Sequence, residues 1–78
     1  MNYLEVSSLV RQEISKYQKE RTLFTVPHEG YAVLLEGMIE LQKEVFKNRE
    51  FRSIPRMVTE AKKVAAIAQK FIVSISQD

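Results

Sequence analysis

Residues that interrupt helices are rare in this chain, and their positions constrain the fold more than any other feature. The 78 residues include two prolines and two glycines. Sandwiches and barrels need such residues at their many tight turns, so this scarcity argues against an all-β fold. Pro27 and Pro55 each suit the first turn of a helix, where a missing N–H costs nothing. The chain is therefore expected to form three long helical segments.

Apolar residues recur at spacings of three and four in all three segments, which is the helical pattern. We predict helices over residues 2–20, 27–48 and 55–76, with Thr25 and Ser53 as N-caps of the second and third. The predicted fold class is all-α, as one domain over residues 1–78. In it the second and third helices form a long helical hairpin.

Two connecting segments separate these helices. Residues 21–26 are expected to be a connector whose Leu23 and Phe24 pack onto the core. Residues 47–56 are polar, contain Pro55 and are expected to form the loop of the hairpin.

The apolar faces indicate self-association. On both long helices they cover about half the circumference, which is more than one three-helix chain can bury. The chain has no cysteine and one histidine, so neither a disulfide nor structural zinc can stabilise it. Chains of this size without such a cross-link often complete their core by association. We therefore expect a homo-oligomer, a dimer at least, with the third helix at the interface.

Charge and hydropathy limit the other partners. The chain has 12 basic and 10 acidic residues, a balance that gives little support to nucleic-acid binding. It contains no apolar stretch of about 18 residues and no basic-then-apolar leader, so neither a membrane partner nor export is expected. A cytoplasmic location is the resulting expectation.

Four glutamates follow one side of the second predicted helix: Glu29, Glu36, Glu40 and Glu44. They fall within an arc of about 80°. Glu36 and Glu40 are neighbours at i and i+4, so they could share a hard cation such as Mg²⁺. Lys43 and Lys47 fall on the same arc, however, and alternating charges are typical of a solvated helix face. Both interpretations remain open from the pattern alone.

Glu60 is unusual because it lies inside the apolar arc of the third predicted helix, about 20° from Ile67 and Phe71. An unpaired carboxylate in a core costs several kcal/mol, so Glu60 needs a partner. That partner is either a cation such as Lys63, one turn on, or a bound metal ion. A structural ion pair and a functional site are both compatible with the pattern.

The loop carries a cluster of basic residues around Phe51: Lys47, Arg49, Arg52 and Arg56. Arginines beside acids are what a phosphate-bearing substrate with a divalent cation requires. A solvated linker would show the same composition.

Two runs of residues carry a family resemblance that covers about residues 25–75. The run PHEGYAVLLE at 27–36, followed by Glu40 and Glu44, resembles the phage-type branch of the MazG-like nucleotide pyrophosphohydrolases. The run EAKKVAAIA at 60–68, followed by Phe71, is similar to the second signature helix of that branch. The resemblance implies an all-α enzyme that hydrolyses nucleoside triphosphates to monophosphate and pyrophosphate. It also implies Mg²⁺ held by an EExxE…ExxD pattern, and assembly as a dimer or tetramer.

The resemblance also assigns the site residues. Glu36 and Glu40 match the outer acids of EExxE and Glu60 opens ExxD, so these three are the implied catalytic and metal-binding residues. Gly37 stands at the second acid and Lys63 at the aspartate. An ammonium one turn from Glu60 competes with Mg²⁺ and is expected to modulate the site. The implied triphosphate-binding residues are Arg49, Arg52 and Arg56.

Two functions follow. The first is a nucleoside triphosphate pyrophosphohydrolase with weakened or lost activity, using Mg²⁺ when active. The alternative is a non-catalytic helical-bundle relative that acts as an oligomeric interaction or structural module, with Lys63 in place of the metal charge.

Overall fold

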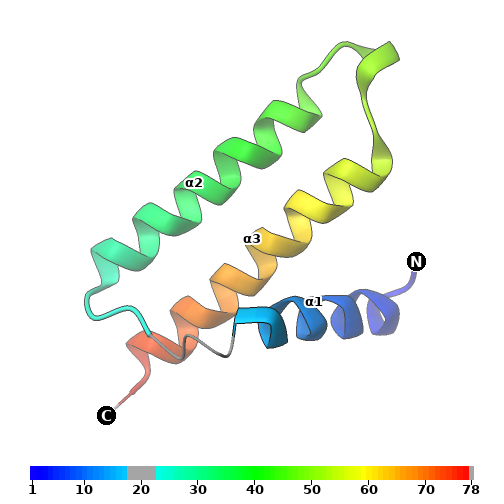
Figure 1. The fold of residues 1–78 in the computed structure, drawn as a ribbon. Helices are drawn as coiled ribbons and strands as arrows, with labels where there is room; N and C mark the ends of the chain where they lie inside the picture. Colours follow the sequence, from blue (N-terminus) through cyan, green and yellow to red (C-terminus); the bar gives the residue numbers. More distant parts are fainter. Residues whose placement is uncertain (18–22, 78) are drawn as a thin grey trace.

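The computed structural model, which describes residues 1–17 and 23–77, is helical throughout (Figure 1). Its elements are α1 (Tyr3–Tyr17), α2 (Pro27–Val45), a 3₁₀ turn η1 (Arg49–Phe51) and α3 (Ile54–Ile75). No strand occurs in the described ranges, so the predicted all-α class with three helices is confirmed. The last residues of the first predicted helix, 18–20, lie outside the described part of the chain.

The second and third helices form the predicted hairpin and pack against each other (Figure 1). Two glycines of α2 make the contact close. A Cβ at Gly37 would lie 3.3 Å from side-chain atoms of both Ile67 and Val64. A Cβ at Gly30 would lie only 2.6 Å from the ring of Phe71. The absence of a side chain at these positions therefore allows α3 to approach the α2 backbone.

The first helix contacts α3 but not α2, and Figure 1 shows it crossing α3 on the side away from α2. Val10 on α1 and Ala66 on α3 are the only buried apolar side chains among the described residues. Glu13 of α1 is also buried, and its carboxylate lies 3.7 Å from the ammonium of Lys62 on α3. Tyr3, at the other end of α1, is 93% exposed. The first helix is thus anchored through its C-terminal half.

The two predicted helix caps have different outcomes. Ser53 caps α3 as predicted, because its hydroxyl accepts a hydrogen bond from the backbone N–H of Arg56 at 3.3 Å. The prediction of Thr25 as the cap of α2 is wrong. Val26 occupies the cap position and provides no side-chain hydrogen bond. The Thr25 hydroxyl instead donates to the Glu29 carboxylate at 3.3 Å, which satisfies the hydroxyl without capping the backbone.

The connector before α2 is tied to the far end of α3. The backbone N–H of Phe24 donates to the Ser74 hydroxyl at 3.0 Å, and the Lys70 ammonium lies 4.6 Å from the centre of the Phe24 ring. Packing of Phe24 is therefore confirmed. The same prediction is wrong for Leu23, which is exposed.

The molecule is elongated and open. Its principal extents are 47 × 27 × 20 Å and its radius of gyration is 13.7 Å, against about 11.5 Å for a compact chain of this length. Large apolar side chains are exposed on every helix. No described helix is long and apolar enough to cross a membrane.

Candidate functional site between α2 and α3

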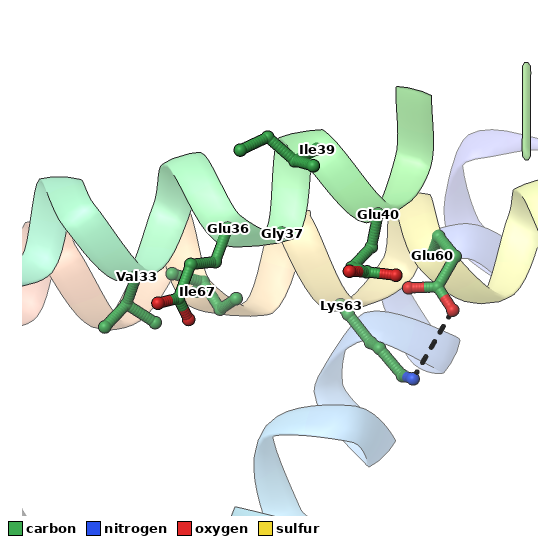
Figure 2. Close-up of a pocket in the computed structure, with 8 residues that line it drawn as sticks. All are labelled: Val33, Glu36, Gly37, Ile39, Glu40, Glu60, Lys63 and Ile67. Atoms are coloured by element: carbon green, nitrogen blue, oxygen red, sulfur yellow. Dashed lines mark ion pairs between the residues drawn. The ribbon is translucent and has the colours of Figure 1, made fainter. Parts of the chain in front are cut away.

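An open groove of about 360 Å³ runs between α2 and α3 (Figure 2). Its walls combine apolar and charged side chains: Val33, Glu36, Gly37, Ile39, Glu40, Glu60, Lys63 and Ile67. The three glutamates assigned by the family resemblance all line it, together with the lysine at the family's aspartate position. The hairpin thus brings together glutamates that are 20 or more positions apart in the sequence.

Glu60 and Lys63 form an ion pair within the groove, as Figure 2 shows. The Lys63 ammonium lies 3.6 Å from a Glu60 carboxylate oxygen, and the side chains are 43% and 23% exposed respectively. Of the two partners that the sequence left open for Glu60, the structure shows the lysine. This pair supplies the positive charge that a carboxylate in an apolar surrounding requires.

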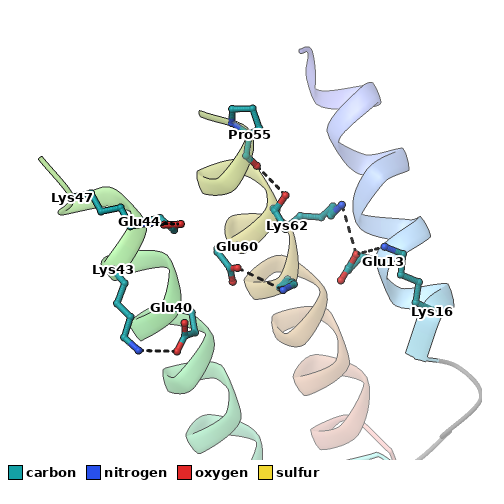
Figure 3. Close-up of polar contacts among 11 residues, drawn as sticks. Glu13, Lys16, Glu40, Lys43, Glu44, Lys47, Pro55, Glu60 and Lys62 are labelled. Atoms are coloured by element: carbon teal, nitrogen blue, oxygen red, sulfur yellow. Dashed lines mark hydrogen bonds and ion pairs between the residues drawn. The ribbon is translucent and has the colours of Figure 1, made fainter. Parts of the chain in front are cut away.

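Two glutamates of α2 pair with lysines of the same helix and differ in exposure (Figure 3). The Lys43 ammonium lies 3.1 Å from the Glu40 carboxylate, and both side chains are more than half exposed. The Lys47 ammonium donates to the Glu44 carboxylate at 2.9 Å. Glu44 does not line the groove, and its side chain is only 14% exposed, so the charge pairing typical of a solvated face is present there but the face is largely covered. Glu40 lines the groove and also pairs with Lys43, whose side chain is exposed to solvent.

The groove provides oxygen donors of the kind Mg²⁺ prefers, but it does not assemble them into a cation site. Among the described residues, no three carboxylate or imidazole side chains are placed so that they could hold one metal ion. Glu40 and Glu60 are each paired with a lysine three residues on in the same helix. A carboxylate at position 37 would need space that Ile67 and Val64 occupy. As folded in one chain, these residues do not fit a bound Mg²⁺.

The predicted phosphate-binding residues, Arg49, Arg52 and Arg56, lie outside the groove lining. All three are exposed at the tip of the hairpin, in and beside η1. Arg52 donates to the backbone carbonyl of Lys47 at 3.4 Å, which closes the loop. Arg56 is the nearest of them to the groove in sequence, one helical turn before Glu60 on α3.

Glu13 is a buried charged residue that the sequence analysis missed. Its side chain is 3% exposed and lies 3.3 Å from the Lys16 ammonium and 3.7 Å from that of Lys62 (Figure 3). A detectable signal was present, because Glu13 falls within about 60° of Val10 on a helical wheel. The argument that singled out Glu60 therefore applies equally to Glu13.

Comparison with known proteins found no protein similar to this chain. No protein-family model matches the chain, and no curated protein or solved structure is significantly similar to it.

Proposed function

We propose that the chain is a homo-oligomeric MazG-like protein with a degenerate nucleotide pyrophosphohydrolase site, so that its hydrolysis of nucleoside triphosphates is weak. One observation carries the proposal. Glu36, Glu40 and Glu60, which the resemblance selects from two distant segments, line a single groove. The groove keeps the acidic character of such a site, and Lys63 explains why the activity is weak.

Lys63 acts on the site through charge. Its ammonium lies 3.6 Å from the Glu60 carboxylate and offsets part of its charge, so Glu60 has a partner that does not require a cation in the groove. The same ammonium repels a divalent cation that approaches Glu60. In this proposal the exposed arginines at the hairpin tip attract the triphosphate by charge and by their donor geometry.

A second candidate function is a non-catalytic helical module that acts through assembly. The observation favouring it is the absence, among the described residues, of three metal-binding side chains near one point. In this alternative the Glu60–Lys63 pair only stabilises α3, and the groove has no catalytic role.

A pyrophosphate-release assay separates the two candidates. We expect slow release from one or more of the common nucleoside triphosphates with millimolar Mg²⁺ or Mn²⁺, and none after Glu60→Gln. Lys63→Asp should increase the rate, because it removes the competing ammonium and adds an oxygen donor. If neither the natural chain nor Lys63→Asp releases pyrophosphate with either cation, the non-catalytic function is correct.

Thermal stability provides a readout that does not depend on turnover. Without a divalent cation, Lys63→Asp should lower stability, because it places two carboxylates at i and i+3 in a half-buried groove. Mg²⁺ should then raise the melting temperature of this variant by mass action. Lys47→Asp is the matched control, since it makes the same charge change beside Glu44 outside the groove. An equal response of both variants to Mg²⁺ would show that the groove has no cation preference.

A further inference from the structure

One side of α2 carries a regular line of exposed residues that nothing in the described chain covers. We call it the α2 seam; it consists of Tyr31, Leu35, Met38, Gln42 and Val45. The spacings alternate four, three, four and three, which is the period of a coiled-coil seam. All five side chains are exposed, from 39% at Val45 to 62% at Tyr31 among the apolar ones. Ile39 and Phe46 extend this apolar surface on one flank.

A shallow hollow of about 350 Å³ follows the seam. It is lined by residues of α2 and its C-cap alone: Leu35, Met38, Ile39, Leu41, Gln42, Val45 and Phe46. A row of protruding and recessed side chains on one helix is the surface into which a second helix packs. The shape therefore suits a helix as the occupant.

The area of the chain indicates how much surface is left to cover. The chain exposes 6467 Å², whereas a folded monomer of this mass exposes about 4,900 Å². The excess is about 1,600 Å² per chain, and a stable interface needs about 800 Å² from each partner. The excess surface of each chain is therefore about twice what a stable interface with a second copy requires.

We propose that two copies of this chain associate through their α2 seams, with the two α2 helices antiparallel. The proposal deepens the assembly part of the proposed function by naming the face and its orientation. It does not depend on whether the groove hydrolyses anything. It also places the interface on α2, whereas the sequence analysis expected it on the third helix.

Charge decides the orientation. Residues 46–56 carry four basic and one acidic side chain, a net charge of +3, in a chain whose total is +2. All of the positive excess is therefore at the tip of the hairpin. A parallel pair would place two such tips together, and like charges at that distance repel. An antiparallel pair puts them at opposite ends of the dimer.

The antiparallel arrangement also gives the one polar seam residue a partner. In one register Leu35 meets the partner's Met38 beside the two-fold axis, and Tyr31 meets the partner's Gln42. A phenol hydroxyl and an amide can donate to and accept from each other, so neither is left unsatisfied in the interface. A single polar residue in such a seam fixes the register. Because Ile39 lines both the hollow and the carboxylate groove, the second copy would border the groove.

Light scattering or sedimentation tests the face. We expect the natural chain to have twice its 9.1 kDa mass at micromolar concentration. Met38→Glu should have the monomer mass and a weaker helical circular dichroism, because a chain with so few buried apolar side chains depends on its partner copy. Ile72→Glu is the matched control, because Ile72 is 60% exposed on α3. This variant should remain dimeric. A monomeric natural chain, or dissociation by Ile72→Glu and not by Met38→Glu, would overturn the proposal.

Disulfide trapping tests the orientation, since the chain has no cysteine of its own. Tyr31→Cys and Gln42→Cys chains are prepared separately, mixed and oxidised. The antiparallel register predicts a mixed disulfide between the two variants. Preferential cross-linking of each variant to itself would indicate a parallel pair and contradict the proposal. Neither experiment measures hydrolysis, so its failure is distinguishable from failure of the proposed activity.

Discussion

At the scale of single residues, the two glycines of α2 have different neighbours although both face α3. A Cβ at Gly30 would meet two aromatic rings, Phe71 at 2.6 Å and Phe24 at 2.8 Å. A Cβ at Gly37 would meet the ends of two aliphatic side chains at 3.3 Å. A rigid aromatic ring must move as a whole to make room, whereas the end of an aliphatic side chain can shift by a few tenths of an ångström. The cost of adding one carbon atom should therefore differ between the two positions.

We predict that Gly30→Ala lowers the free energy of unfolding by about 1–2 kcal/mol, because overpacking exceeds the gain in helix propensity. Gly37→Ala should change it by less than about 1 kcal/mol, since a few tenths of an ångström of movement restores normal contact and alanine favours the helix. Urea denaturation of both variants measures the difference. Equal losses would mean that the rings near Gly30 move freely.

At the scale of whole helices, the hairpin was more predictable than the position of α1. Proline positions and apolar periodicity are local signals, and they located α2 and α3 to within a few residues at each end. The apolar stripe of the first helix includes Tyr3 and Val10 alike, yet only Val10 is buried. Where α1 crosses α3 determines which part of the stripe is covered, and no local pattern contains that crossing.

Around the groove, too, local sequence patterns predicted contacts within one helix and missed those that depend on the path of the chain. The inward position of Glu60 and its pairing with Lys63 could be predicted, because both lie one turn apart on one helix. The separation of Arg49 from the groove could not, since it depends on the path of the loop through η1.

The contact between α1 and α3 should be separable from the hairpin. Ala66 is one turn from Lys62 on α3, and Lys62 pairs with Glu13 of α1, so Ala66 faces α1. Ala66→Leu should therefore overpack this contact and lower stability by about 1–3 kcal/mol. Hydrogen exchange should accelerate mainly in α1. Ala61→Leu, at an exposed position of the same helix, is the control and should leave exchange in α1 unchanged. Acceleration spread equally over all three helices would show that α1 and the hairpin unfold as one unit.

At the scale of the whole molecule, the described chain has too little core to explain a stable fold. Its buried apolar side chains are Val10 and Ala66, whereas large apolar side chains on α2 remain open to solvent. Small domains are marginal even when they bury about 60% of the surface that the unfolded chain exposes. The stability of this fold should accordingly be inseparable from its assembly, with dissociation and unfolding occurring together.

Thermal unfolding followed by circular dichroism at two protein concentrations tests this coupling. For a dimer that unfolds to two chains, a hundredfold increase in concentration adds about 2.7 kcal/mol per dimer to the free energy of unfolding. At the entropy typical of two such chains, this shifts the melting temperature upward by about 5–10 °C. Leu4→Glu should show the same shift, because Leu4 is 83% exposed on the free end of α1. A melting temperature independent of concentration would mean that a single chain is stable by itself, and the exposed α2 seam would then need a different partner to account for it.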